Sequence, residues 1–100
     1  MEQELEVKYT SKAAENIAEI ALYISGKGYP ETAYKFMEQL YLFGNSLGFW
    51  AYKYQICRHP QFAQRNYRCA VFKKNYVFIY EVSSNFVTVL NVVNCSTIYW

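Results

Sequence analysis

The last third of the chain, residues 67–93, most constrains what the protein can fold into. It contains three runs rich in β-branched and aromatic residues, which read Y-R-C-A-V-F, Y-V-F-I-Y-E-V and F-V-T-V-L-N-V-V. The polar triplets K-K-N and S-S-N separate these runs, and such short polar breaks are typical of an antiparallel meander. We therefore predict strands near residues 67–73, 76–83 and 86–94.

The residues before this meander predict one more strand and two helices. Residues 4–10 alternate apolar and polar side chains, as a half-buried strand does. Apolar residues then recur at helical spacing over residues 13–24 and again over residues 33–47. Pro30 suits the first turn of the second helix, because its missing N–H would have no partner there.

Chain length and the order of these elements predict the fold class. A chain of 100 residues can bury one modest core, so we expect a single domain over residues 1–100. The fold class is α+β with the order β-α-α-β-β-β. A short connection makes the two helices an antiparallel hairpin, packed on one face of a small antiparallel sheet. The residues expected in the core are Ile17, Ile20, Phe36, Leu40, Val71, Ile79 and Val89.

Residues 49–66 show no clear period. They hold Trp50, Tyr52, Tyr54 and Phe62 among basic side chains. A stretch of this length without structure is unusual in a compact domain, so it is either functional or contains a short element that the sequence does not reveal.

Composition, cysteine content and net charge bear on the cellular compartment and on the possible partners. No run approaches the ~20 apolar residues that span a bilayer, and the acidic start M-E-Q-E differs from a signal peptide. Cys57, Cys69 and Cys95 are odd in number and widely spaced, which indicates reduced thiols in a cytoplasmic protein. The net charge of +2 permits an acidic or nucleic-acid partner but predicts neither.

The sequence offers little support for a metal or cofactor. His59 follows Cys57 by two residues, but no second pair of ligands follows at the spacing of a zinc site. Adjacent positions in a loop also do not create a cysteine–histidine nucleophile pair. We predict no metal and no cofactor.

Basic residues are the first group of candidate contacts. Arg65, Arg68, Lys73 and Lys74 lie within ten residues of each other and could meet DNA, RNA or an acidic partner. The two lysines could equally form a solvated hairpin turn. Arg68 differs because its position in a strand gives its side chain a fixed direction.

Aromatic residues are the second group, since they make up 20% of the chain and exposed aromatic surface is often an interface. Tyr34 and Tyr41, with Tyr23 and Leu42, lie off or at the edges of the helical core stripes. They either complete the packing of the hairpin or contact a partner. Trp100 is expected to dock on the body of the protein or on a partner.

Several segments together resemble the RelE/ParE superfamily, the toxins of bacterial type II toxin–antitoxin (plasmid stabilisation) systems. They are V-K-Y-T-S-K-A at residues 7–13, Y-R at 67–68 and N-Y-V-F-I-Y-E-V at 75–82, and the match runs over residues 7–99. The resemblance implies a cognate antitoxin that covers the helices and sheet. It also implies a toxin–antitoxin hetero-oligomer or a homo-oligomer.

The family divides by mechanism. RelE-like members cut mRNA on the ribosome with basic residues that stabilise developing negative charge, helped by a C-terminal tyrosine. ParE-like members instead bind DNA gyrase. On the RelE pattern Arg68 keeps the first basic position, whereas Ala70, Val77 and Cys95 stand where further positive charge is usual. The resemblance therefore favours a ParE-like gyrase inhibitor that is not an enzyme.

Two alternatives stay open. One is a RelE-like, ribosome-dependent mRNA endoribonuclease with a rearranged basic set. In that case Arg65 and Arg68 would bind phosphate, and Tyr99 would position the attacking 2′-hydroxyl. The other is an inactive family member that only binds its antitoxin.

Overall fold

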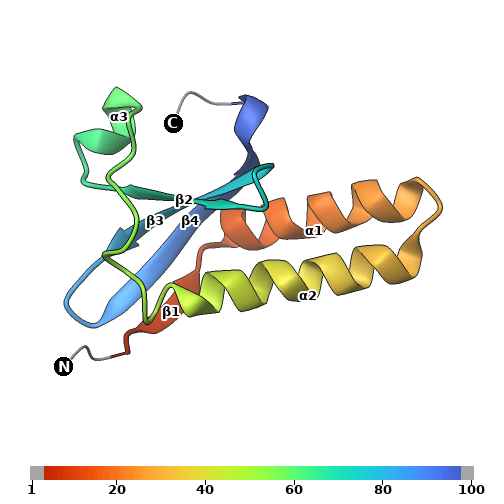
Figure 1. Cartoon of the computed structure of the whole chain (residues 1–100), viewed down its shortest axis with the longest axis horizontal. Coiled ribbons are helices and arrows are strands. Elements are labelled where there is room, and N and C mark those ends of the chain that lie inside the picture. The colour runs from red at the N-terminus through yellow and green to blue at the C-terminus, as the bar shows by residue number, and fades with distance from the viewer. Residues whose placement is uncertain (1–3, 98–100) are drawn as a thin grey trace.

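The computed structural model describes residues 4–97 and has the predicted α+β fold (Figure 1). Its two long helices pack with a four-stranded sheet, and a short helix and a 3₁₀ turn complete the described chain. The elements in order are β1 Glu6–Tyr9, α1 Ser11–Gly26, α2 Pro30–Ser46, α3 Pro60–Ala63, β2 Arg68–Phe72, β3 Tyr76–Val82, β4 Phe86–Asn94 and η1 Cys95–Thr97.

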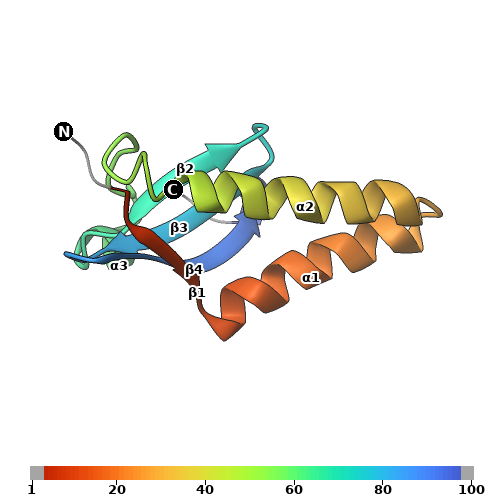
Figure 2. The same cartoon turned by 90° about the horizontal axis from the view of Figure 1, so that it is seen from below.

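Local sequence explains the helix hairpin. The Thr10 hydroxyl accepts a hydrogen bond from the Ala13 N–H at 3.0 Å and so caps α1. Gly28 adopts a φ of 92°, which lets the chain reverse before Pro30 begins α2. The helices lie side by side and extend well past the sheet (Figure 2). None of the helices in residues 4–97 is long and apolar enough to cross a membrane.

The sheet has the strand order β1-β4-β3-β2. Its last three strands form the predicted antiparallel meander. β1 runs parallel to β4, with Glu6 opposite Phe86 and Tyr9 opposite Val89, so the sheet as a whole is mixed. The direction of an edge strand depends on how the helix hairpin returns the chain, which the alternation within the strand does not encode.

The main core lies between the helix hairpin and the sheet. Ile17, Leu40 and Val89 are fully buried there, as predicted, whereas Ile20 and Phe36 are half-buried at its margin. These positions confirm the predicted phase of both helices.

One polar residue of α1 also enters this core. The Asn16 Oδ1 accepts hydrogen bonds from the Val92 N–H at 3.1 Å and from the Asn91 side chain at 3.3 Å. Those bonds compensate for burying the amide and fix α1 against β4.

The opposite face of the sheet carries a second, smaller core. Ile79 is buried in it with Cys57, Cys69 and Val77. Figure 1 shows α3 and η1 on this side of the sheet and the long helices on the other. The predicted core residue Val71 is half-buried. The sheet is thus covered on both faces, by the helix hairpin on one and by residues 57–67 on the other.

The prediction of reduced thiols is wrong for two of the cysteines. Cys57 and Cys69 form a disulfide, with their Cα atoms 5.1 Å apart. The physical reason is an isolated bridge between Ile56 and Arg68, which aligns the chain before α3 with the start of β2. Two backbone bonds continue this pairing, from the Cys57 N–H to the Tyr67 carbonyl at 2.8 Å and from the Cys69 N–H to the Gln55 carbonyl at 3.2 Å.

Residues 49–66 contain the short element that the sequence left open. They cross the β2 edge from the helix side of the sheet to the other side and then form α3 (Figure 1). His59 caps the N-terminus of α3, because its Nδ1 accepts a hydrogen bond from the Gln61 N–H at 3.3 Å.

Candidate protein-interaction site

Arg68 is the most firmly placed of the predicted contact residues. It begins β2, and its Nη1 donates a hydrogen bond of 2.6 Å to the Tyr54 carbonyl. The guanidinium carbon lies 5.1 Å from the centre of the Tyr52 ring, within the range of a cation–π contact. The side chain is half-buried and is held both by the hydrogen bond to Tyr54 and by the contact with the Tyr52 ring. Its positive charge therefore has a defined position at the sheet edge.

The structure places Arg65 elsewhere. This exposed side chain follows α3, and a hydrogen bond to the Tyr67 side chain, with a smaller effect of Glu81, raises its pKa. Arg68 lies opposite Tyr80 in the pairing of β2 with β3, and the Tyr80 ring is in the core between the sheet and the long helices, so the Arg68 side chain is on that face. Glu81 is the next residue of β3 and is therefore on the opposite face. The contacts therefore put Arg65 and Arg68 on opposite sides of the sheet.

Lys73 and Lys74 occupy the β2–β3 turn. Their φ values of 52° and 66° are those of a type I′ hairpin turn, so both lysines serve the turn. Lys73 has a further contact, since its Nζ lies 2.6 Å from the Gln39 Oε1 of α2. The prediction that the lysines form a hairpin turn therefore accounts for Lys74. Lys73 has a second role, because its contact with Gln39 ties the meander to the helix hairpin.

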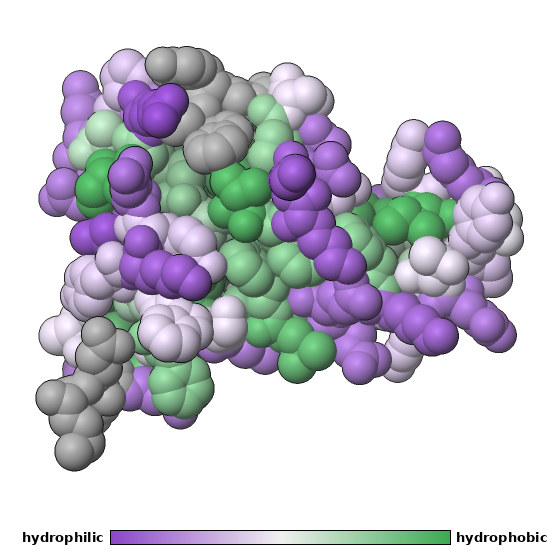
Figure 3. Space-filling view, in the orientation of Figure 1, coloured by the Kyte–Doolittle hydropathy of each residue, from purple (hydrophilic) through white to green (hydrophobic). Residues whose placement is uncertain are grey.

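The predicted tyrosines of α2 differ in exposure. Tyr34 is 67% exposed, whereas Tyr41 is half-buried with its ring 5.1 Å from that of Tyr9. Burial, then the neighbouring Tyr41, raises the pKa of Tyr9 to about 12. A shallow hollow of about 250 Å³ follows this face of α2, lined by Tyr34, Met37, Glu38, Tyr41, Leu42 and Asn45. Figure 3 shows apolar side chains gathered over α2 and the β2 edge, with hydrophilic ones around them.

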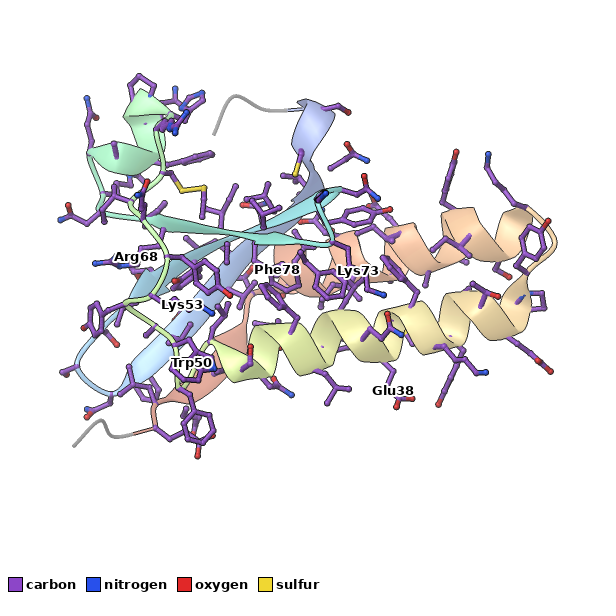
Figure 4. The ribbon with its side chains drawn as sticks, viewed as in Figure 1. Glu38, Trp50, Lys53, Arg68, Lys73 and Phe78 are labelled. Carbon is purple, nitrogen blue, oxygen red and sulfur yellow. A yellow bond between two sulfur atoms is a disulfide. The ribbon has the colours of Figure 1, made fainter. Side chains whose placement is uncertain are left out.

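Residues 49–54, which we call the aromatic loop, belong to the segment that the sequence left open as functional or structured, but none of them was among the predicted contact residues. Phe49, Trp50 and Tyr52 are 54%, 51% and 68% exposed. The Lys53 Nζ lies 5.5 Å from the centre of the Trp50 ring and 5.6 Å from that of Tyr54. Figure 4 shows Trp50, Lys53 and Arg68 along the segment that crosses the sheet edge. The density of rings in a segment without a period was the signal that could have found this surface.

Other sequence candidates do not join a site in the described part of the chain. Tyr99 and Trp100 lie outside the described residues. His59 caps α3 and stacks on Phe62, with ring centres 4.9 Å apart. Within residues 4–97, no three His, Cys, Asp or Glu side chains gather where they could hold a metal ion. The described geometry offers fixed positive charges beside exposed rings, which suit binding to carboxylates and apolar side chains.

Comparison with known proteins supports the fold through structure only. No protein-family model matches the chain, and no curated protein matches its sequence significantly. A solved structure of the chromosomal ParDE TA (toxin–antitoxin) system from P. aeruginosa contains a chain with the same fold. The TM-score is 0.76 at 17% sequence identity, over 90% of this chain and 95% of that one. At this identity the likeness establishes the fold, and function has to be argued from the residues.

Proposed function

We propose that the protein is the toxin of a type II toxin–antitoxin module, of the ParE-like kind. It would arrest growth by binding DNA gyrase and would be neutralised by a cognate antitoxin in the cytoplasm. The observation that carries the proposal is the fold shared with a chain of a ParDE system over nearly the whole length of both chains. The sequence resemblance to the same superfamily supports it independently.

The structure supports binding over RNA cleavage. Ala70 and Val77 stand where the RelE pattern has positive charge, and both are fully buried. A charge placed there would be cut off from solvent and from any substrate. Cys95, at the third such position, is half-buried against the second core. Since Arg65 and Arg68 also lie on opposite sides of the sheet, they are poorly placed to share one phosphate.

The helix hairpin is the surface that we assign to the antitoxin. Tyr34 and Leu42 of α2 and Tyr23 of α1 are each more than half exposed. An amphipathic or extended antitoxin segment that fills the hollow along α2 would cover Tyr34 and Leu42, which line it. Tyr23 lines a different hollow, beside β3 and β4. Lys73, whose Nζ lies beside Gln39 of α2, could pair with carboxylates of the antitoxin segment.

Purified protein tests the choice of target directly. We expect it to inhibit supercoiling by gyrase and to leave mRNA intact in a translating ribosome extract. Arg68→Ala should weaken gyrase inhibition, because it removes the positive charge with the most defined position at the sheet edge. Lys12→Ala, at an exposed position in the first turn of α1, is the matched control and should have no effect.

Two results would contradict this function. Codon-specific mRNA cleavage that Arg65→Ala or Tyr99→Phe abolishes would establish the endoribonuclease alternative. A protein that co-purifies with the product of a neighbouring small gene, but affects neither gyrase nor mRNA, would be the inactive antitoxin-binding member.

A further inference from the structure

Residues 58–66 lie over the second core, but few of their side chains anchor them there. None of these side chains is fully buried, and the half-buried ones are those of His59, Phe62 and Ala63. α3 has only four residues, and a helix of that length is not stable without tertiary contacts. Apolar packing therefore attaches this segment weakly, in contrast to α1 and α2, which bury Ile17 and Leu40 in the helix-side core.

The Cys57–Cys69 disulfide is the strongest attachment of this segment. Both cysteines are buried in the second core, and the bond joins the chain just before the segment to β2 (Figure 4). Backbone hydrogen bonds from Cys57 to Tyr67 and from Cys69 to Gln55 add to it. Such bonds contribute little on their own, because water replaces them when the chain opens. The position of the segment therefore depends mainly on the disulfide.

Two contacts on the helix side of the sheet limit how far the chain can open. The Tyr80 hydroxyl donates a hydrogen bond of 2.8 Å to the Ala51 carbonyl, and the Arg68 Nη1 donates one of 2.6 Å to the Tyr54 carbonyl. Ala51 and Tyr80 belong to the helix-side core, so these contacts do not depend on the disulfide. Loss of the bond would therefore release residues 55–67, which we call the covering segment.

The sheet face beneath the covering segment is apolar. Val77 and Ile79 are 0% and 2% exposed, and Phe62 and Tyr67 of the segment pack against them. Opening would expose these side chains to water, which opposes it, and would restore conformational freedom to the released residues, which favours it. A crosslink between the ends of the segment removes most of that freedom, so its redox state shifts the balance.

We propose that the Cys57–Cys69 bond is a redox-sensitive switch for the second face of the sheet. In the oxidised protein it keeps the covering segment closed. In the reduced protein the segment opens as a unit, while the helix-side core and the aromatic loop stay folded. A dithiol supplies two electrons and two protons, so that the sulfur–sulfur bond breaks, two cysteine thiols form and the dithiol becomes a cyclic disulfide. This switch goes beyond the proposed function and does not depend on it.

Hydrogen exchange followed by mass spectrometry tests the proposal. Cys57 and Cys69 are 2% and 7% exposed, so a reductant reaches the bond slowly. Reduced protein is therefore prepared by unfolding in dithiothreitol and refolding with the reductant present. Peptides from the covering segment should exchange about tenfold faster or more in the reduced form, because local opening is then less costly. Peptides from α2 and β4 should stay protected in both forms at the same labelling times.

Trypsin gives an independent readout. Arg58 and Arg65 are exposed within the covering segment, but a protease cleaves only where the backbone can leave its folded conformation. Cleavage after these two arginines should be about tenfold faster or more in the reduced protein. Lys12 and Lys35 are exposed in α1 and α2 and are the internal controls, with slow cleavage expected in both forms.

Cysteine variants separate the bond from other effects of the reductant. The double variant Cys57→Ala, Cys69→Ala should behave as the reduced protein and should not respond to dithiothreitol. Cys95→Ala keeps the bond and is the matched control, which should respond to reduction as the wild type does.

Two outcomes would overturn the proposal. One is equal exchange of the covering segment in the oxidised and reduced proteins. The other is a simultaneous loss of protection in α2 and β4, since the bond would then support the whole fold and not a local switch. Neither measurement uses gyrase or an antitoxin, so failure here and failure of the toxin function can be told apart.

Discussion

Reduction of the Cys57–Cys69 disulfide should destabilise the protein by about 3 kcal/mol. The two cysteines are 12 residues apart in sequence, and the loop-closure entropy removed from the unfolded chain by a crosslink of that span gives this figure at 25 °C. The bond also ties the chain before α3 to β2, so its loss frees the cover of the second core.

Urea unfolding with and without reductant measures this difference. The same reductant applied to the double variant Cys57→Ala, Cys69→Ala is the control and should change nothing. Mass spectrometry after alkylation of the unfolded, unreduced protein should find one modified thiol, that of Cys95. Three modified thiols would show that the bond does not form. A difference below about 1 kcal/mol with the bond formed would refute the entropic reasoning.

Three further predictions concern the helix-side core. Leu40→Ala should lower the free energy of unfolding by about 2–5 kcal/mol, since Leu40 is fully buried; a loss below 1 kcal/mol would contradict this. Gly44→Ala should cost about 1–3 kcal/mol in the same urea assay, because its methyl group would meet the hydroxyl of Tyr9, whereas Gly26→Ala meets nothing and should be close to neutral. Because the pKa of Tyr9 is raised from 10.0 to about 12, its contribution to stability is present below pH 10 and is lost as pH rises through about 12. Stability should therefore fall less steeply over that window in Tyr9→Phe, and parallel curves would contradict the burial argument.

Local patterns determined most of the secondary structure. The alternation in β3 places Phe78 on the helix side and Val77 on the other, and both are fully buried because the sheet is covered on both faces. Pro30 began α2 and Gly28 reversed the chain before it, as residues restricted to particular backbone conformations do. These features depend on neighbours within a few residues, so the sequence alone could predict them.

Long-range pairing decided the remainder. The parallel direction of β1, the Cys57–Cys69 bond and the separation of Arg65 from Arg68 each depend on how distant segments meet. The sequence determined that this protein is a helix hairpin on a meander with an excess of aromatic and basic side chains. Only the tertiary structure decided which of those side chains are exposed together, because burial and contact are properties of packed elements and not of their local pattern.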